Sequence, residues 1–101
     1  MRIEMGTSGF DILDGNIQQS ILWGDIVEVS AYKRDLITID QLCLHLILRH
    51  GAEVTVNEDF EGFWDWLTKL ETQLGIGAEW RTQVLYPAFR ENRQTIYRRG
   101  L

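Results

Sequence analysis

The sequence has one cysteine, Cys43, and one proline, Pro87. A single cysteine excludes a disulfide framework within the chain and suits a reducing compartment, so we expect a cytoplasmic protein. Proline removes a backbone donor from a sheet, so its absence from residues 1–86 favours strands with complete hydrogen-bond ladders. Long apolar runs are also absent, since the longest apolar-rich stretch, Leu42 to Leu48, has seven residues and contains His45. Crossing a bilayer takes about 20 residues, so no membrane partner is expected.

Signals for secretion and for catalysis are absent as well. Residues 1–20 carry Glu4, Asp11 and Asp14 and no apolar core, unlike a secretory signal. The sequence contains no glycine-rich phosphate loop, no Gly-x-Ser-x-Gly, no His-Glu-x-x-His and no Cys-x-x-Cys. It therefore predicts no catalytic residue, no metal site and no cofactor, and we expect a protein that is not an enzyme.

Charge is distributed unevenly along the 101 residues. Residues 1–89 hold six basic and fourteen acidic side chains, whereas residues 90–101 hold four arginines and one glutamate. An acidic body repels nucleic-acid phosphates and anionic lipid, so no nucleic acid is expected and a basic protein surface is the favoured partner. The length and the apolar fraction of 45% suit one domain. We expect a single α+β domain over residues 1–89, with residues 90–101 as a basic tail that packs on it or extends from it.

Apolar residues that recur with a period of two predict a series of short strands. The expected strands are Arg2–Met5, Gly9–Leu13, Ile17–Leu22, Ile26–Arg34, Leu36–Leu48 and Glu53–Val56. Asp14-Gly15-Asn16 predicts a tight hairpin turn, because glycine and asparagine tolerate positive φ. The strand from Leu36 to Leu48 is apolar on both faces, which indicates a central strand.

The stretch after these strands predicts one amphipathic helix over residues 59–74. Its apolar residues recur at spacings of three and four and form one stripe toward the sheet. The stripe consists of Phe60, Phe63, Trp64, Leu67, Leu70 and Leu74. Trp66 lies away from it, and we expect the C-terminal segment to cover Trp66 rather than leave it as an exposed interface anchor. Gly75 and Gly77 are expected to end the helix.

A second, short helix is predicted over residues 78–85, with Trp80 and Val84 directed inward. Pro87 is expected to stop this helix. The sequence as a whole predicts an α+β fold in which a curved antiparallel sheet of about five to seven strands is capped by the longer helix.

The corner after the first hairpin carries a resemblance to known proteins. Ile21, Trp23 and Ile26 stand where small bacterial proteins with a pleckstrin-homology-like (PH-like) fold often have an Ile-x-Trp-x-x-Ile corner. Over residues 21–99 the chain also resembles uncharacterised bacterial proteins of similar length. The segments that carry this second resemblance are Ala31–Leu36, Thr38–Leu44, Asn57–Phe63, Pro87–Phe89 and Ile96–Arg99.

The resemblance implies a curved half-barrel closed by a helix, and a binding scaffold rather than an enzyme. Phosphoinositide binding is not implied, because this chain lacks a dense basic loop between its first strands.

Cys43 and His45 share one face of their strand, so a shared metal or a nucleophilic role is conceivable from their spacing. A metal site needs more ligands, and His50 is the only other imidazole in the sequence. Buried free cysteine commonly acts as a small core hydrophobe. The spacing therefore favours a structural interpretation.

Carboxylates are numerous from Glu53 to Asp65, and they leave three interpretations open. A desolvated pair would serve as acid and base in a hydrolase. Glu61 and Asp65 lie four apart, on the helix face opposite Phe63 and Leu67, which indicates a solvated face. The functional interpretation that we retain is a docking patch for a basic partner, made of Glu58, Glu61 and Asp65.

Two basic segments are secondary candidates. Lys33-Arg34-Asp35 is expected to form an exposed hairpin tip, either simply solvated or in contact with a partner protein. The arginines of residues 90–101 could touch nucleic acid, but without a wider basic surface they support this weakly. Binding of this tail to the acidic face of a second copy, which would give a homodimer, accounts for them equally well.

The sequence thus predicts a non-catalytic protein-binding module. Its most concrete form is a small acidic bacterial immunity or inhibitor protein that masks a toxin or effector, because acidic complementarity speeds capture of a basic partner. The expected contacts are Glu58, Glu61 and Asp65, with Lys33 and Arg34 secondary. The alternative is a PH-like regulatory module that binds a peptide or small ligand in a groove between sheet and helix.

Overall fold

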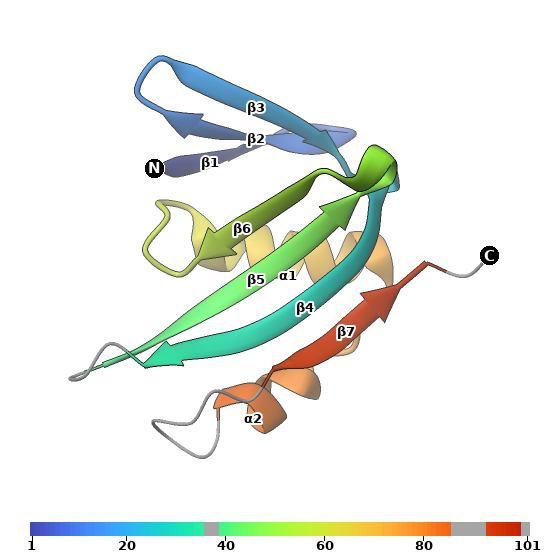
Figure 1. Ribbon diagram of the computed structural model, residues 1–101. Coiled ribbons are helices and arrows are strands. Elements are labelled where there is room, and N and C mark those ends of the chain that lie inside the picture. The colour runs from blue at the N-terminus through green and yellow to red at the C-terminus, as the bar shows by residue number, and fades with distance from the viewer. Residues whose placement is uncertain (36–38, 86–92, 100–101) are drawn as a thin grey trace.

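A computed structural model describes residues 1–35, 39–85 and 93–99 (Figure 1). The described residues form an α+β fold, as expected. In chain order its elements are β1 (Arg2–Met5), β2 (Gly9–Asp14), β3 (Ile17–Leu22), η1 (Trp23–Asp25), β4 (Ile26–Asp35), β5 (Asp40–Leu48), η2 (Arg49–Gly51), β6 (Glu53–Asn57), α1 (Phe63–Leu74), α2 (Trp80–Leu85) and β7 (Gln94–Arg98). The predicted strand start at Leu36 and the predicted stop at Pro87 lie outside the described residues.

The described strands divide into two antiparallel sheets, not the one curved sheet that the sequence led us to expect. One sheet has the order β1-β2-β3, and the other has the order β6-β5-β4-β7. The single turn of 3-10 helix at η1 redirects the chain, so the consecutive strands β3 and β4 belong to different sheets. In Figure 1 the three-stranded sheet lies above the four-stranded sheet, and α1 lies behind the latter.

The hairpin between β2 and β3 forms at the predicted turn. Asp14 pairs with Ile17 across a two-residue loop, and Gly15 has a φ of 61°. A positive φ at the first loop residue lets the turn follow the twist of the strands. At the other end of this hairpin, Gly9 lies so close to β3 that a Cβ there would be 2.0 Å from the Ile21 carbonyl oxygen.

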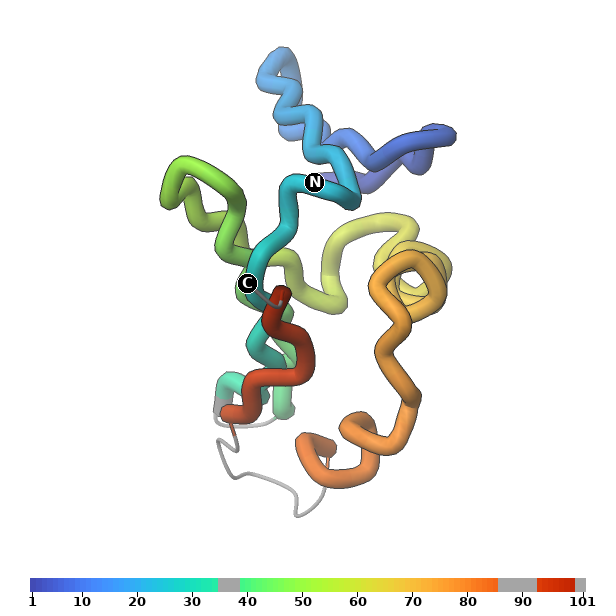
Figure 2. The backbone as a smooth tube through the Cα atoms, turned by 90° about the vertical axis from the view of Figure 1, so that its right-hand side faces the viewer, coloured from blue at the N-terminus to red at the C-terminus, as the bar shows by residue number. Residues whose placement is uncertain are grey.

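The strand β5 is one of the two inner strands of the four-stranded sheet, as predicted. It pairs with β4 on one side and β6 on the other. Leu42, Leu44 and Leu46 are fully buried beneath it, and Cys43 is buried on its opposite face. Figure 2 shows α1 on one side of this sheet and below the three-stranded sheet, so the core fills the space that these three elements enclose.

An aromatic cluster fills the core where α1 meets the three-stranded sheet. The ring of Phe10 lies 4.9 Å from that of Trp23 and 5.4 Å from that of Trp66, and Phe63 lies 5.7 Å from Trp66. Trp66 is fully buried, whereas Trp64 is 48% exposed. Trp66 is thus covered, as expected, but it lies on the buried stripe of α1 and packs on Phe10 and Phe63. The predicted place of Trp64 on that stripe is wrong.

The reason is the point at which the helix begins. Glu61 forms an isolated bridge with Arg2, and Gly62 has a left-handed φ of 86°, so α1 begins only at Phe63. The predicted stripe included Phe60 as its first member, one helical turn before Trp64, which moved the stripe toward Trp64. Counted from Phe63, the buried positions of α1 are Phe63, Trp66, Leu67, Leu70 and Glu71.

The charged residue on the buried stripe, Glu71, joins α1 to α2. Its carboxylate accepts hydrogen bonds from Trp80 Nε1 at 2.9 Å and from Arg81 Nε at 3.0 Å. Such partners offset the cost of burying a charge. Trp80 and Val84 are buried, which confirms their predicted inward direction, and Gly75 ends α1 with a φ of 68°.

The described part of the basic tail is a strand at the edge of the four-stranded sheet. β7 pairs with β4, and Arg98 Nε donates to Glu28 at 2.9 Å. Arg99 donates from Nη2 to the Gly24 carbonyl at 2.9 Å and to the Ile26 carbonyl at 3.2 Å. These two arginines thus make contacts within the chain.

Neither described helix is long and apolar enough to span a membrane.

Candidate functional site

The loop from β6 to α1 places the predicted acidic residues. Glu58 accepts a hydrogen bond at Oε1 from the Leu42 backbone amide at 2.7 Å, and Asp59 accepts one at Oδ2 from Gln41 Nε2 at 2.6 Å. Asn57 caps the turn, since its Oδ1 accepts from the Asp59 amide at 2.9 Å. Glu58 and Asp59 are therefore engaged in fixing the loop against β5.

Glu61 and Asp65 present their side chains to solvent. The backbone of Glu61 is fixed, because its carbonyl accepts from the Ile3 amide at 2.9 Å and its amide donates to the Met1 carbonyl at 3.0 Å. Asp65 lies in the first turn of α1, where a negative charge also favours the helix dipole. The two residues were predicted to share one helix face, but Glu61 precedes the helix.

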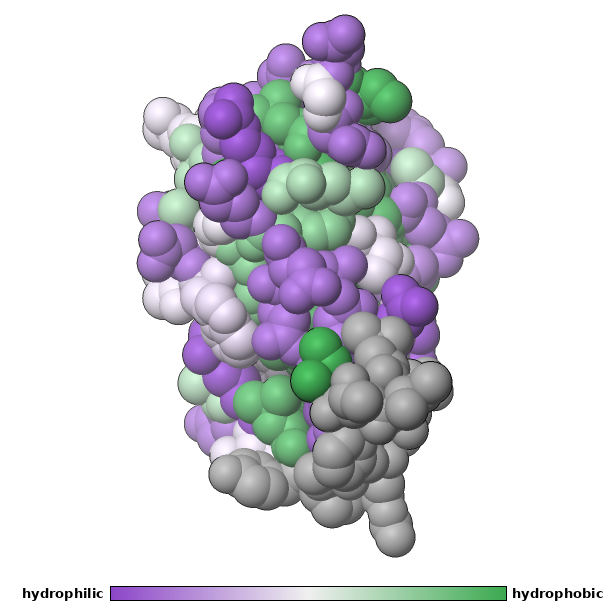
Figure 3. Space-filling view, turned by 90° about the vertical axis from the view of Figure 1, so that its left-hand side faces the viewer, coloured by the Kyte–Doolittle hydropathy of each residue, from purple (hydrophilic) through white to green (hydrophobic). Residues whose placement is uncertain are grey.

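Trp64 lies between these carboxylates in the chain and is half exposed. Its ring meets Phe63 edge to face, with centroids 5.0 Å apart and planes at 87°. Because Phe63 is buried, this contact anchors Trp64 to the core while much of its surface stays in water. We call Glu61, Trp64 and Asp65 the acidic patch. Figure 3 views the side of the molecule that carries the β2–β3 turn, and hydrophilic side chains separate the hydrophobic areas there.

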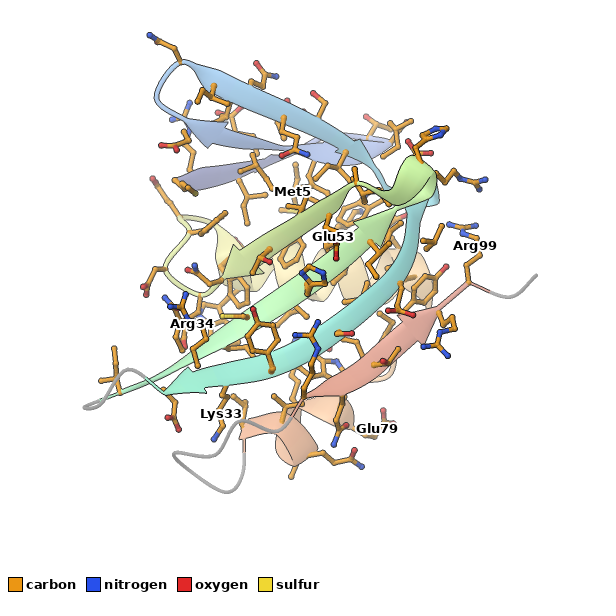
Figure 4. The ribbon with its side chains drawn as sticks, in the orientation of Figure 1. Met5, Lys33, Arg34, Glu53, Glu79 and Arg99 are labelled. Carbon is orange, nitrogen blue, oxygen red and sulfur yellow. The ribbon has the colours of Figure 1, made fainter. Side chains whose placement is uncertain are left out.

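Lys33 and Arg34 do not form an exposed pair, so the predicted hairpin tip is wrong for Lys33. Both residues belong to β4, and successive strand residues point to opposite faces. Lys33 is 3% exposed, and its Nζ donates to Asp40 at 3.2 Å and to the Leu85 carbonyl at 3.0 Å. Figure 4 shows Lys33 directed toward α2 and Arg34 lying over the front of the sheet.

A polar group occupies the front of the four-stranded sheet, opposite α1. His45 contacts Thr55 Oγ1 through Nδ1 at 3.1 Å and Glu53 Oε1 through Nε2 at 2.8 Å. Tyr32 pairs with Cys43 across the strands, and the Arg93 guanidinium lies 4.8 Å from the Tyr32 ring centre. Figure 4 shows Glu53 projecting from β6 beside an imidazole ring.

This polar group does not make a catalytic pair. Both ring nitrogens of His45 contact Thr55 and Glu53 rather than the thiol of Cys43. Burial raises the pKa of Cys43, which favours the thiol over the nucleophilic thiolate. Over the described ranges, no three His, Cys, Asp or Glu side chains group so as to hold a metal ion.

Stability at alkaline pH tests this environment. Burial, followed by the neighbouring Cys43, raises the pKa of Tyr32, and burial also raises the pKa of Cys43. An unfolded chain releases these protons first, from about pH 8.5 for cysteine and about 10 for tyrosine, so the folded state then binds more protons and stability falls as pH rises.

We expect the free energy of unfolding, measured by urea titration, to decrease through this alkaline range. Tyr32→Phe should make the decrease shallower, because it removes one of the two titrating groups. Stability that is level or rises with pH would contradict the buried environment of this pair.

Two surface depressions lie away from the predicted groove between sheet and helix, and one of them reaches the acidic patch at Glu61. One of about 280 Å³ lies on the three-stranded sheet beside Met5, Gly9 and Leu22. The other, also about 280 Å³, is lined by Met1, Arg2, Leu13, Gly15 and Glu61. Glu61 is thus the one predicted contact residue that borders a described depression.

No protein-family model, curated protein or solved structure matches the chain.

The residue that sequence reasoning missed is Trp64. Its exposure follows from the start of α1 at Phe63, and the signal available in the sequence was Gly62, which is unfavourable inside a helix by about 1 kcal/mol relative to alanine. A helix that begins after this glycine, not before it, leaves Trp64 on the outer side.

Proposed function

We propose that the chain is a non-catalytic protein-binding module that captures a basic partner through the acidic patch. The observation that supports this is the half-exposed Trp64 between two exposed carboxylates at the start of a packed helix. Exposed tryptophans often dominate binding energy, because they bury a large rigid surface with little loss of entropy. Neighbouring carboxylates favour a basic surface and raise the association rate.

The concrete form of this proposal is a small bacterial immunity or inhibitor protein that works in the cytoplasm and masks a toxin or effector. The net charge of −5 supports a basic partner and disfavours nucleic acid and anionic lipid. The patch needs no chemistry of its own, because masking a partner requires only contact. Glu58 and Lys33 leave the proposed contact set, since both are engaged within the fold, and the exposed Arg34 stays as a secondary contact.

Capture of the partner tests the proposal. The tagged chain should copurify one basic protein in equal amount from extracts of its source cells. The variant Glu61→Lys/Trp64→Ala/Asp65→Lys should lose that protein, and Trp64→Ala alone should weaken binding by about 2 kcal/mol, roughly thirtyfold in Kd. Isothermal titration with the purified partner measures this change.

The matched control is Asp14→Lys/Glu79→Lys, which changes the net charge equally at two other exposed acids. This control should retain the partner. Equal loss in both variants would show that charge in general, not the patch, drives capture, and wild-type chain that captures no protein would refute the proposal.

A second candidate is a PH-like regulatory module that binds a peptide or small ligand. Two antiparallel sheets with an amphipathic helix on the inner side support the PH-like relation. The depression beside Gly9 supports a ligand, although its volume of about 280 Å³ is just below the usual range for such sites. Native mass spectrometry separates the candidates, because a retained small molecule favours this one and a bound protein favours the first.

A further inference from the structure

The outer edge of β3 is an unprotected strand edge. β3 is the last strand of the three-stranded sheet, and no described strand lies along its other side (Figure 1). Its sequence, Ile-Gln-Gln-Ser-Ile-Leu, contains no charged residue, no proline and no glycine. Ile17 is 71% exposed and Leu22 is 53% exposed. A neutral edge of this kind is a ready template for another strand.

The other three sheet edges carry the usual protection. β1 has Arg2 and Glu4, and the chain at Glu61 bridges to it. β6 carries Glu53, and β7 carries Arg98. Charged side chains on an edge disfavour pairing, because a second strand would desolvate them. Of the four edge strands that the structure describes, β3 alone is uncharged.

The backbone groups of β3 alternate between its partner and solvent. The Trp23 amide donates to the Ser8 carbonyl at 3.1 Å, directly beyond the pair Gly9–Leu22. In an antiparallel ladder every second pair exchanges hydrogen bonds. The hydrogen-bonded positions are therefore Trp23 and every second residue before it. The backbone amides and carbonyls of the odd-numbered residues of β3 thus point to β2. The even-numbered residues Gln18, Ser20 and Leu22 therefore direct their amides and carbonyls away from the sheet.

We propose that β3 pairs antiparallel with β3 of a second copy, which joins two three-stranded sheets into one of six strands. Chemical complementarity favours a second copy as the partner of this edge. A charged partner strand would lose hydration against this neutral edge, and a neutral partner strand would not. The neutral edge strand that the chain itself offers is β3. A twofold axis perpendicular to the sheet makes the strand its own partner and keeps the buried faces of both sheets on the same side.

The faces fix the register. Ile17, Gln19 and Ile21 share the inner face of the sheet, where Ile21 is buried beside Phe10. Continuous inner faces require odd residues opposite odd residues, because a slip of one residue exchanges the two faces. With the axis at Gln19, each exposed Ile17 lies opposite Ile21 of the other copy and loses its contact with water. Gln18 then lies opposite Ser20, and the two Gln19 side chains meet on the axis.

Solution mass measured against concentration tests this pairing. Wild-type chain should move from the mass of one copy toward twice that mass as concentration rises in sedimentation equilibrium. Ser20→Pro should stay at the mass of one copy, since it removes an outward amide. It should also keep its fold, because proline is tolerated on an edge strand where the amide faces solvent. Circular dichroism reports that fold.

A charge exchange tests the register. Gln19→Lys should abolish self-association, because two ammonium groups would meet on the axis, and Gln19→Glu should do so as well. Mixing the two variants should restore a pair that contains one copy of each. Gln73→Lys, at an exposed position on α1, is the matched control and should associate like wild type.

Three outcomes would overturn the pairing. They are a wild-type chain that keeps the mass of one copy at every concentration, a pair that survives Ser20→Pro, and Lys and Glu variants that do not pair when mixed. The test is independent of the acidic patch, because Glu61→Lys/Trp64→Ala/Asp65→Lys should self-associate normally even if it loses its partner.

Discussion

Replacing Trp66 by alanine is expected to lower the free energy of unfolding by about 3–5 kcal/mol. Trp66 is fully buried, and its ring lies 5.4 Å from Phe10 and 5.7 Å from Phe63. The substitution removes these contacts and leaves a cavity between α1 and the three-stranded sheet. Since a domain has about 5–15 kcal/mol in total, much of the stability would be lost. Urea unfolding followed by circular dichroism measures the change.

Trp64→Ala is the matched control, because it makes the same tryptophan-to-alanine change two positions away. Trp64 is half exposed, so we expect a loss below about 1 kcal/mol. Trp66→Phe should cost less than Trp66→Ala, because it keeps an aromatic ring and removes an indole N–H that has no partner among the described residues. Equal costs at Trp64 and Trp66 would contradict the burial of Trp66 and the exposure of Trp64.

Replacing Lys33 by methionine is expected to cost about 3–5 kcal/mol, because it leaves the partly buried Asp40 carboxylate without this ammonium group. Lys33 is buried and joins Asp40 of β5 to the Leu85 carbonyl of α2. Loss of the pair should therefore loosen α2 as well as the ends of β4 and β5. Hydrogen exchange of the Trp80–Leu85 amides, together with urea unfolding, measures both effects.

Arg34→Met is the matched control at the neighbouring exposed position, where we expect a change within about 0.5 kcal/mol. The double variant Lys33→Met/Asp40→Leu should recover part of the loss, because it removes both charges together. A single variant that costs no more than Arg34→Met would contradict the buried pair.

Period-two alternation was enough to predict the strands β1 to β6, but not β7, which lies in the predicted basic tail. The β2–β3 turn follows from Asp14-Gly15-Asn16, and the central position of β5 follows from a strand that is apolar on both faces. The C-terminal cap at Gly75 and the short helix α2 also follow from local residue types. These features depend on neighbours in the sequence, so local patterns suffice.

Features that depend on distant segments were harder to predict. The start of α1 depends on the bridge between Glu61 and Arg2, which no local spacing reveals. The burial of Lys33 depends on Leu85, fifty-two positions further along the chain. The division into two sheets likewise depends on which strands meet after the corner at η1.

The acidic patch could be predicted only in part. Glu61 and Asp65 are exposed as expected, whereas Glu58 is engaged by the Leu42 amide of β5. The sequence could not separate these three carboxylates, because each looks solvated when only its neighbours are considered. Trp64 joined the patch through the helix start, a long-range feature of the fold.

The pairing of β7 with β4 sets the order in which a ribosome can complete this fold. Glu28 and Arg98 lie seventy positions apart, so β4 waits for its outer neighbour until nearly all of the described chain has been synthesised. Ribosomes add about 5–20 residues per second, so β4 stays uncovered on that side for several seconds. We expect ribosome-bound chains that lack residues 94–99 to bind chaperones more strongly than ribosome-bound chains in which these residues lie outside the exit tunnel.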